Sequence, residues 1–341
     1  MNSKLTVQGV DPKSKTISNT TEVVGEGEKR RKKVDINVLN PIQVNGVKVT
    51  FTCINAFTEK NRAKNDSNNK KRENIIVCII NNAIPKDYYK HSKVWSSLKN
   101  EIDILLKKIC QQKNITTIDN IVCQHRAGRS NHYDFKIIIN SDVHFQIEFK
   151  FNASCVNDAP QFVSPMHPSQ YLSSSFEEYY YDNHFIPLVE EFNMTLPEKA
   201  EYLKSVHSNL PKCLEEHQVT YYRGCKRSSK YSGEKNDENF YKSAKKTSKC
   251  SILNFISENG LDKDKLTAYL LETQKDKYYM LYKEGILNLE TRNLDEYVIT
   301  SITKEPKKSR FIAKTKTGRV LKILLRWKNG NGIAFPSFQI S

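Results

Sequence analysis

The chain has 341 residues, and its 54 Lys and Arg against 38 Asp and Glu give a formal net charge of +16. Hydrophobic residues make up 38% of the chain, which is enough for a folded core and excludes disorder of the whole chain. The longest aliphatic run, 75–80, is far shorter than the ~20 residues of a membrane helix, so we expect no membrane span. The first residues contain no apolar stretch that could act as a secretory signal, so we do not expect secretion. The positive surplus predicts a polyanionic partner.

The N-terminal third of the chain changes character at residue 34. Residues 1–33 are rich in Ser, Thr, Gly and charge, so we expect a flexible basic arm. Residues 34–90 follow as a β-rich extension of the core. Within it, 47–54 alternates like a half-buried strand and 75–80 is typical of a fully buried strand. The Asn- and Lys-rich stretch 59–73 between them is expected to be a mobile loop.

The central segment, 91–215, carries the clearest periodicity. Apolar residues recur every three or four positions over 93–112, which predicts an amphipathic helix. Two alternating stretches follow, 132–139 and 143–151, and their short connection favours an antiparallel hairpin. An acidic, helical region is expected at 168–192.

The remainder of the chain is basic. We interpret 216–250 as a basic linker or insertion and 251–341 as a basic α+β nucleic-acid-binding domain. Helices are predicted near 251–258 and 263–275, and strands from about residue 296 onward.

Three polar residues of the expected hairpin share one face. Side chains two apart on a strand point the same way, so Glu148 and Lys150 project together from the face opposite the apolar residues. Asp134 is out of phase with the apolar residues of the preceding strand and can point to that face too. Two converging carboxylates suit Mg²⁺, with Mn²⁺ as a substitute. Such an ion prepares a water for attack on phosphorus, and Lys150 could position that water or stabilise the transition state.

These residues resemble the motif of the PD-(D/E)XK nuclease superfamily, the restriction-endonuclease-like fold. The resemblance covers about 93–192 and rests on Asp134, Glu148 and Lys150, on consecutive antiparallel strands behind the helix. The sequence departs from the family in having Tyr133 where a Pro often precedes the Asp. A solvated Glu–Lys ion pair on an edge strand is the alternative explanation.

The resemblance implies an α/β fold, in which a mixed sheet is flanked by helices. It also implies a metal-dependent phosphodiesterase that acts on DNA. In the family a helical glutamate often points toward the metal, and Glu101 is the candidate here. Many members place a Gln or Lys at the start of the next element, where Gln161 stands.

Cations flank the expected catalytic strands. Some precede the first strand, some alternate with Tyr near 221–231, and some alternate with apolar residues over 310–328 so that one face of a hairpin would be positive. The residues expected to contact nucleic acid are Arg126, Arg129, Arg223, Lys226, Arg227, Lys314, Lys316, Arg319, Arg326 and Lys328.

The sequence thus predicts a DNA endonuclease, restriction-like or directed at foreign DNA. One alternative is a non-catalytic nucleic-acid-binding protein descended from a nuclease. Another is an RNA endonuclease of the cap-snatching type, which adds a His ligand to the same fold; His125 and His132 raise this reading, although they lie next to the strand. The eight Cys include no C-x-x-C pair, so reduced thiols in the cytoplasm or nucleus are expected, not secretion. A homodimer is compatible with the sequence.

Overall fold

The structure is a computed structural model in which the described residues are 41–44, 47–59, 65–126, 131–158, 161–163, 167–206, 215–327 and 336–341. The expected basic arm, Arg129 and Lys328 lie outside these residues. The chain divides into two compact units. Unit 1 consists of the described residues of 1–128, 133–158 and 276–291, and unit 2 of those of 129–132, 159–275 and 292–341.

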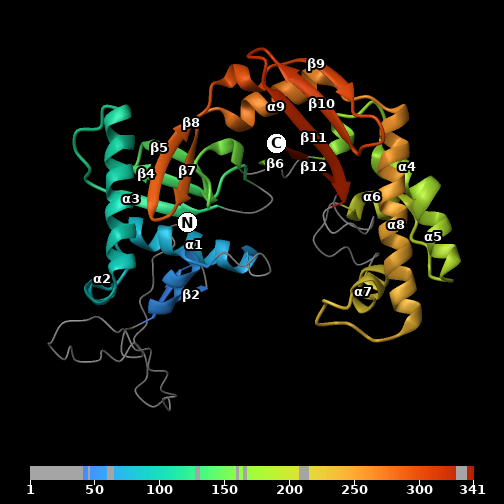
Figure 1. Cartoon of the computed structure of the whole chain (residues 1–341), viewed down its shortest axis with the longest axis horizontal. Helices are drawn as coiled ribbons and strands as arrows, with labels where there is room; N and C mark the ends of the chain where they lie inside the picture. Colours follow the sequence, from blue (N-terminus) through green and yellow to red (C-terminus); the bar gives the residue numbers. More distant parts are fainter. Residues whose placement is uncertain are drawn as a thin grey trace. The chain divides into compact units, whose positions relative to one another are not determined.

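Unit 1 is built on a mixed five-stranded sheet (Figure 1). In spatial order its strands are β3 (Ile121–His125), β4 (Phe135–Ile139), β5 (Val143–Phe151), β7 (Lys277–Lys283) and β8 (Ile286–Thr291). Only the β5–β7 pair of this sheet is parallel. In Figure 1 the orange strands β7 and β8 lie beside the green β4 and β5, although more than a hundred residues separate them in the sequence. The predicted β4–β5 hairpin is confirmed.

Helices cover the apolar face of this sheet. The bounds of the other elements of unit 1 are β1 (Ile42–Val44), β2 (Val47–Val49), the 3₁₀ helix η2 (Phe51–Phe57), α1 (Asn65–Ile80), α2 (Lys86–His91), α3 (Lys93–Gln112) and the 3₁₀ turn η4 (Val156–Asp158). The amphipathic helix predicted at 93–112 is confirmed as α3. The strand predicted over 47–54 ends at residue 49, where η2 takes over after Thr50.

The strand expected at 75–80 and the loop expected at 59–73 are corrected, because most of this stretch forms the single helix α1. All six residues of 75–80 are buried, so an unbroken apolar run fits a helix enclosed on every side as well as a central strand. The polar first half is also anchored. The guanidinium of Arg72 donates to the carbonyls of Ala56 and Glu59 at 2.7 and 2.9 Å and covers the ring of Phe151.

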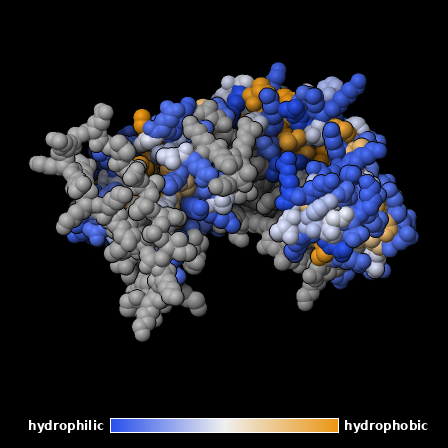
Figure 2. Space-filling model, turned by 60° about the horizontal axis from the view of Figure 1, so that its bottom comes forward, coloured by the Kyte–Doolittle hydropathy of each residue, from blue (hydrophilic) through white to orange (hydrophobic). Residues whose placement is uncertain are grey.

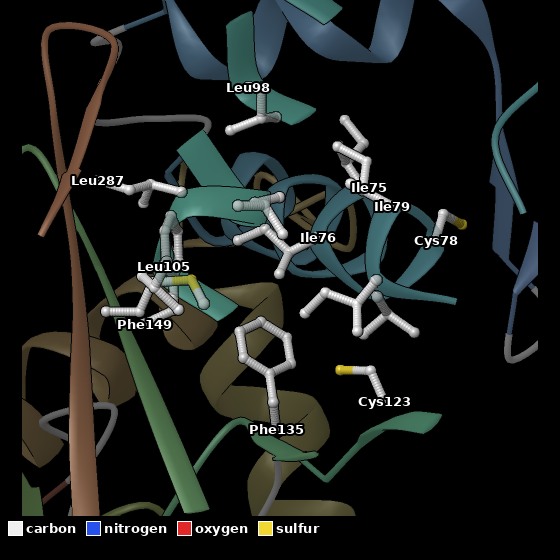
Figure 3. Packing of buried hydrophobic residues seen from close by; sticks show 14 of the residues in the cluster. Ile75, Ile76, Cys78, Ile79, Leu98, Leu105, Cys123, Phe135, Phe149 and Leu287 are labelled. Atoms are coloured by element: carbon white, nitrogen blue, oxygen red, sulfur yellow. The ribbon is translucent and has the colours of Figure 1, made fainter. Parts of the chain in front are cut away.

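The core of unit 1 forms between these helices and the sheet. Figure 3 shows Ile76 of α1 and Leu105 of α3 meeting Phe135 of β4 and Phe149 of β5, all in one buried cluster. Phe135 and Ile147 are fully buried, and each alternates with a residue that is partly exposed. The helix side of the sheet is therefore apolar, which leaves the other face for polar side chains.

Unit 2 contains an antiparallel five-stranded sheet and most of the helices. Its strand order is β6 (Gln161–Val163), β12 (Pro336–Ile340), β11 (Val320–Trp327), β10 (Arg310–Thr315) and β9 (Ile299–Lys304). Its helices are α4 (Phe176–Tyr180), α5 (Ile186–Glu191), α6 (Lys199–Ser205), α7 (Glu215–Arg223), α8 (Lys235–Glu258) and α9 (Lys263–Gln274), with shorter turns η5 (Pro168–Gln170), η6 (Tyr181–Phe185, a π-helix) and η8 (Leu294–Tyr297). The helical prediction for 168–192 and the helix near 263–275 agree with these bounds.

The two units do not follow the expected domain boundaries. Residues 276–291 were assigned to the C-terminal domain, but they complete the sheet of unit 1. Conversely, we expected 91–215 to form the nuclease core, but the described residues of 161–215 belong to unit 2. The expected linker 216–250 contains most of α7 and the first two thirds of α8. Each described unit mixes helices and strands, so the α/β class is confirmed. None of the described helices combines the length and the apolar character that a membrane crossing requires.

Candidate active site

Two carboxyl groups, those of Asp134 and Glu148, lie near each other at one end of the β4–β5 hairpin of unit 1. Asp134 immediately precedes β4, yet its N–H donates to the carbonyl of Ile147 at 2.9 Å and its carbonyl accepts from the N–H of Arg126 at 2.7 Å. The β4–β5 register ends with Phe135 opposite Ile147, so Asp134 comes just before this pair and Glu148 just after it, and the charge of Glu148 acts on Asp134. The structure therefore brings together the two residues that the sequence pattern selected as metal ligands.

The carboxyl group of Asp134 lies in a negative, poorly solvated environment. Burial, followed by the charges of Glu148 and Glu73, raises its pKa to about 7. The N–H of Phe149, which donates to Oδ2 at 2.8 Å, and the ammonium of Lys150 oppose this rise only in part. Such a carboxyl group becomes fully ionised at neutral pH only when a further cation approaches it.

Glu148 has the opposite environment, because each of its oxygens contacts an ammonium. Oε1 lies 2.5 Å from Nζ of Lys150, and Oε2 lies 2.9 Å from Nζ of Lys277. Burial opposes ionisation, but the two lysines outweigh it and lower the pKa of Glu148 to about 2. The predicted Lys150 is thus in place beside Glu148.

Sequence reasoning missed Lys277, the first residue of β7. Its side chain is only 4% exposed, and it stands opposite Gln146 in the parallel β5–β7 register, diagonal to Glu148. No local motif marks it, because its contact with Glu148 depends on strand pairing across more than a hundred residues. A lysine at the start of an otherwise apolar strand was the single available signal.

The helical glutamates Glu101 and Glu73 have different partners in the structure. Oε2 of Glu101 on α3 accepts from the N–H of Leu287 at 2.9 Å, so this carboxylate tethers α3 to β8. Glu73 on α1 is the helical carboxylate whose charge acts on Asp134, and its Oε2 lies 2.7 Å from Nε2 of His125. The sequence analysis expected 59–73 to be a loop, so it did not predict Glu73 as a helical acid of the site.

The remaining predicted site residues are distributed over both units. Arg126 stands opposite Asp134 in the extended ladder of unit 1, and its Nη2 donates to Oε1 of Gln124 at 2.6 Å. Gln161 lies in β6 of unit 2, where it pairs with Ile340. His132 also belongs to unit 2 and packs edge-on against Tyr269, with ring centroids 5.7 Å apart.

The donor set fits a hard divalent cation. Among the described residues, no three His, Cys, Asp or Glu side chains already converge closely enough to hold a metal. Mg²⁺ commonly takes one or two carboxylates and completes its shell with waters and substrate phosphate, so the neighbouring Asp134 and Glu148 are sufficient protein ligands. Burial and the nearby charges of Glu148 and Glu73 favour a cation beside Asp134, because a positive ion would offset the repulsion among the three carboxylates.

Exposed cations gather on unit 2. Lys314 of β10 and Lys322 of β11 are exposed on one face of its sheet, diagonal to each other, while the neighbouring residues Phe311 and Ile323 are buried on the helix side. Arg326 follows on the same face of β11, and partial burial lowers its pKa. Figure 2 shows hydrophilic residues over most of the visible described surface, with small hydrophobic patches between them.

Several of the other cations expected to bind nucleic acid are engaged with acids. Their ion pairs are Arg223–Asp237 at 3.0 Å, Lys226–Glu238 at 3.3 Å, Lys316–Asp295 at 3.1 Å and Arg319–Glu296 at 2.9 Å. Arg227 is exposed. In the same basic region, α8 presents an exposed row that the sequence analysis did not single out, formed at helical spacing by Lys242, Lys245, Lys246 and Lys249.

No protein-family model, curated protein or solved structure matches the chain.

Proposed function

We propose that the chain is a metal-dependent phosphodiesterase that cleaves DNA, with a restriction-endonuclease-like core in unit 1. The observation that carries this proposal is the pair of neighbouring carboxyl groups, Asp134 and Glu148, which act on each other electrostatically, with Nζ of Lys150 2.5 Å from Glu148. A solvated surface ion pair would have neither the burial of these groups nor an acid with a raised pKa beside it. Perturbed carboxylates with assigned partners are typical of catalytic sites.

The arrangement of elements supports the finer fold assignment. Helix α3 precedes the β4–β5 hairpin, as the resemblance implies, and packs on the opposite side of the sheet from the site. The catalytic acid stands at the start of one strand, and Glu148 and Lys150 lie near the end of the next. Glu73 of α1, whose charge acts on Asp134, would take the role that the resemblance implied for Glu101.

Asp134 and Glu148 would hold Mg²⁺ or Mn²⁺, which lowers the pKa of a bound water and neutralises a phosphate oxygen. Lys150 is placed to orient the attacking water or to stabilise the charge that develops on phosphorus. The backbone N–H of Phe149 fixes Oδ2 of Asp134, so this carboxylate is oriented before substrate arrives.

Unit 2 would hold the substrate. Its exposed Lys314 and Lys322, with the α8 row, can neutralise backbone phosphates, and such contacts do not depend on base sequence. The described cysteines are unpaired thiols, which suits a reducing compartment, the cytoplasm or nucleus. We expect DNA as the partner, with endonucleolytic action that is restriction-like or directed at foreign DNA.

The test is cleavage of supercoiled plasmid and linear DNA in Mg²⁺ or Mn²⁺ by the wild type, Asp134→Ala and Lys150→Ala. Each variant should lose at least about a hundredfold in rate. Asp142→Ala, in the exposed β4–β5 turn, and Lys108→Ala, on the exposed face of α3, are matched controls that should cut like the wild type. Equal cutting by all five proteins, or no cutting with any metal, would refute the proposal and favour a non-catalytic nucleic-acid-binding protein.

RNA is a second candidate substrate, favoured by one observation. His125 contacts Glu73, whose charge acts on Asp134, so a histidine lies close to the acidic part of the site, although it comes from a strand and not from the helical part as in the cap-snatching endonucleases. A His ligand favours Mn²⁺ over Mg²⁺. Direct comparison of single-stranded RNA and DNA of one sequence, in each metal, separates the two: a Mn²⁺-dependent preference for RNA that His125→Ala abolishes would establish RNA as the substrate.

A further inference from the structure

Lys277 is a buried lysine whose positive charge has no role in the proposed set of Asp134, Glu148 and Lys150. Glu148 needs one cation to neutralise it, and Lys150 already lies 2.5 Å from Oε1. A second ammonium nevertheless reaches Oε2 at 2.9 Å from a side chain that is only 4% exposed. Burial of an ammonium is unfavourable unless its partners compensate for the lost hydration, and a carboxylate shared with Lys150 compensates only in part.

The surroundings of Lys277 offer little else to stabilise its charge. The ring of Tyr279, on the same face of β7, lies 5.9 Å from Nζ, at the limit of a useful cation–π contact. Gln146, its neighbour across the β5–β7 pair, is uncharged. A negatively charged ligand on this face would complete the balance.

We propose that Lys277 is a phosphate-binding catalytic residue of this site, which contacts a non-bridging oxygen of the phosphodiester to be cleaved. This inference rests on the proposed phosphodiesterase function and adds a fourth catalytic side chain to it. Glu148 keeps the ammonium on the polar face until substrate arrives.

The charge that develops in the reaction gives Lys277 a role. A phosphodiester attacked by hydroxide passes through a transition state with two negative charges, one from each reactant. Asp134, Glu148 and the nearby Glu73 add negative charge of their own, so a divalent ion and Lys150 do not offset the developing charge by themselves. Lys277 supplies one more positive charge in this poorly solvated site.

Lys277 and a metal ion also compete for Glu148. Both are cations that approach its oxygens, so removal of the lysine should leave metal binding unchanged or strengthen it, whatever the role of the lysine. A lysine that only neutralised Glu148 would not contact phosphate, so its loss would leave the affinity for an oligonucleotide without metal unchanged. A loss of that affinity together with the rate is therefore the signature of a phosphate-binding role.

The experiment compares the wild type with Lys277→Met, which keeps the length of the side chain and removes its charge, and with Lys277→Arg, which keeps the charge. Lys283→Met is the matched control, since this lysine lies at the exposed end of the same strand and bonds to Ser154. Single-turnover cleavage of a defined DNA duplex gives the rate, titration with Mn²⁺ gives metal affinity, and binding of a short single-stranded oligonucleotide without metal gives phosphate affinity.

We expect Lys277→Met to lower the single-turnover rate about a hundredfold. Its Mn²⁺ affinity should be unchanged or several-fold higher, and its oligonucleotide affinity several-fold lower. Lys277→Arg should recover part of the rate, and Lys283→Met should equal the wild type. If Lys277→Met does not fold, Lys277→Gln takes its place in all three measurements.

Two results would overturn the inference while leaving the proposed function intact. In the first, the wild type cuts DNA and the single-turnover rate of Lys277→Met lies within threefold of the wild-type rate. In the second, the rate of Lys277→Met falls but its oligonucleotide affinity without metal equals that of the wild type, which assigns Lys277 to the neutralisation of Glu148 alone. A wild type that cuts no nucleic acid with any metal refutes the proposed function itself, and unchanged oligonucleotide binding by Lys277→Met would then refute the phosphate contact as well.

Discussion

The two five-stranded sheets of the molecule use the same alternation of apolar and polar residues for different ends. In unit 1 the polar face of the sheet carries neighbouring acids and two poorly exposed lysines, of which Lys277 is 4% exposed. In unit 2 the polar face carries Lys314 and Lys322, both exposed to solvent. Charge is therefore concentrated and desolvated in one sheet and dispersed in the other.

Topology explains the difference. The sheet of unit 2 is entirely antiparallel, and its hairpin β10–β11 turns at Gly318, which has a φ of +83° that other residues rarely adopt. In unit 1 the chain returns after a long excursion and lays β7 parallel to β5. The inserted strand covers the flank of β5, which brings Lys277 to Glu148 and shields both from water. A long-range strand pair thus converts a surface ion pair into a site with strongly perturbed carboxylates.

The comparison predicts that buried charge makes unit 1 sensitive to pH. The pKa of Asp134 in the folded protein, about 7, lies above its value in an unfolded chain, so the folded state binds the extra proton. The corresponding stability is fully present below about pH 4 and is lost as the pH rises through 7. Between pH 5 and pH 8 the metal-free protein should lose about 2–3 kcal/mol from this group.

Chemical denaturation of the metal-free wild type and Asp134→Asn at pH 5 and pH 8 measures this loss in the free energy of unfolding. The variant should lack the loss of 2–3 kcal/mol, since the amide does not titrate. Asp87→Asn, whose carboxylate is half-exposed beside Lys90, is the control and should follow the wild type. Equal pH dependence in wild type and Asp134→Asn would show that Asp134 is not in a strained electrostatic environment.

Local periodicity was sufficient to predict the part of the site that lies on one hairpin. Helix α3, the β4–β5 hairpin, and the shared face of Asp134, Glu148 and Lys150 all follow from spacings within a few residues. These features depend on the local backbone geometry of helices and strands, so the spacing of residues in the sequence is enough to predict them.

The rest of the site depends on tertiary pairing, which local patterns do not encode. Lys277 reaches Glu148 through the parallel β5–β7 pair, and Glu73 reaches Asp134 from a helix that resembled a loop and a strand in sequence. The six buried residues of 75–80 satisfy either interpretation, because a helix enclosed on all sides loses its amphipathic signature. Ion pairs such as Arg223–Asp237 were equally invisible, since the acid lies fourteen residues along the chain on another helix.

The two helical glutamates, Glu73 and Glu101, should differ in their effect on metal binding. Glu73→Gln removes a negative charge that acts on Asp134, so a divalent cation should bind less tightly, and the Mg²⁺ concentration that gives half-maximal cleavage should rise about tenfold. Glu101→Gln keeps an acceptor for the N–H of Leu287 and should change that concentration by less than about twofold. A larger shift for Glu101→Gln than for Glu73→Gln would return the role of helical acid to α3.

The smallest expected effect concerns the dispersed cations of unit 2. The double variant Lys314→Gln and Lys322→Gln removes two exposed charges, so DNA affinity in Ca²⁺, measured by fluorescence anisotropy, should fall about fivefold at moderate salt. The slope of log affinity against log salt concentration should become shallower by about two, because each lost phosphate contact releases about one counterion fewer. Lys107→Gln with Lys108→Gln removes the same charge from the exposed face of α3 and should leave this slope almost unchanged. If the slope changed equally in both double variants, net charge and not the sheet face of unit 2 would attract the substrate. The two pairs of lysines carry the same charge, so only direct phosphate contacts by Lys314 and Lys322 can make their effects on the slope differ.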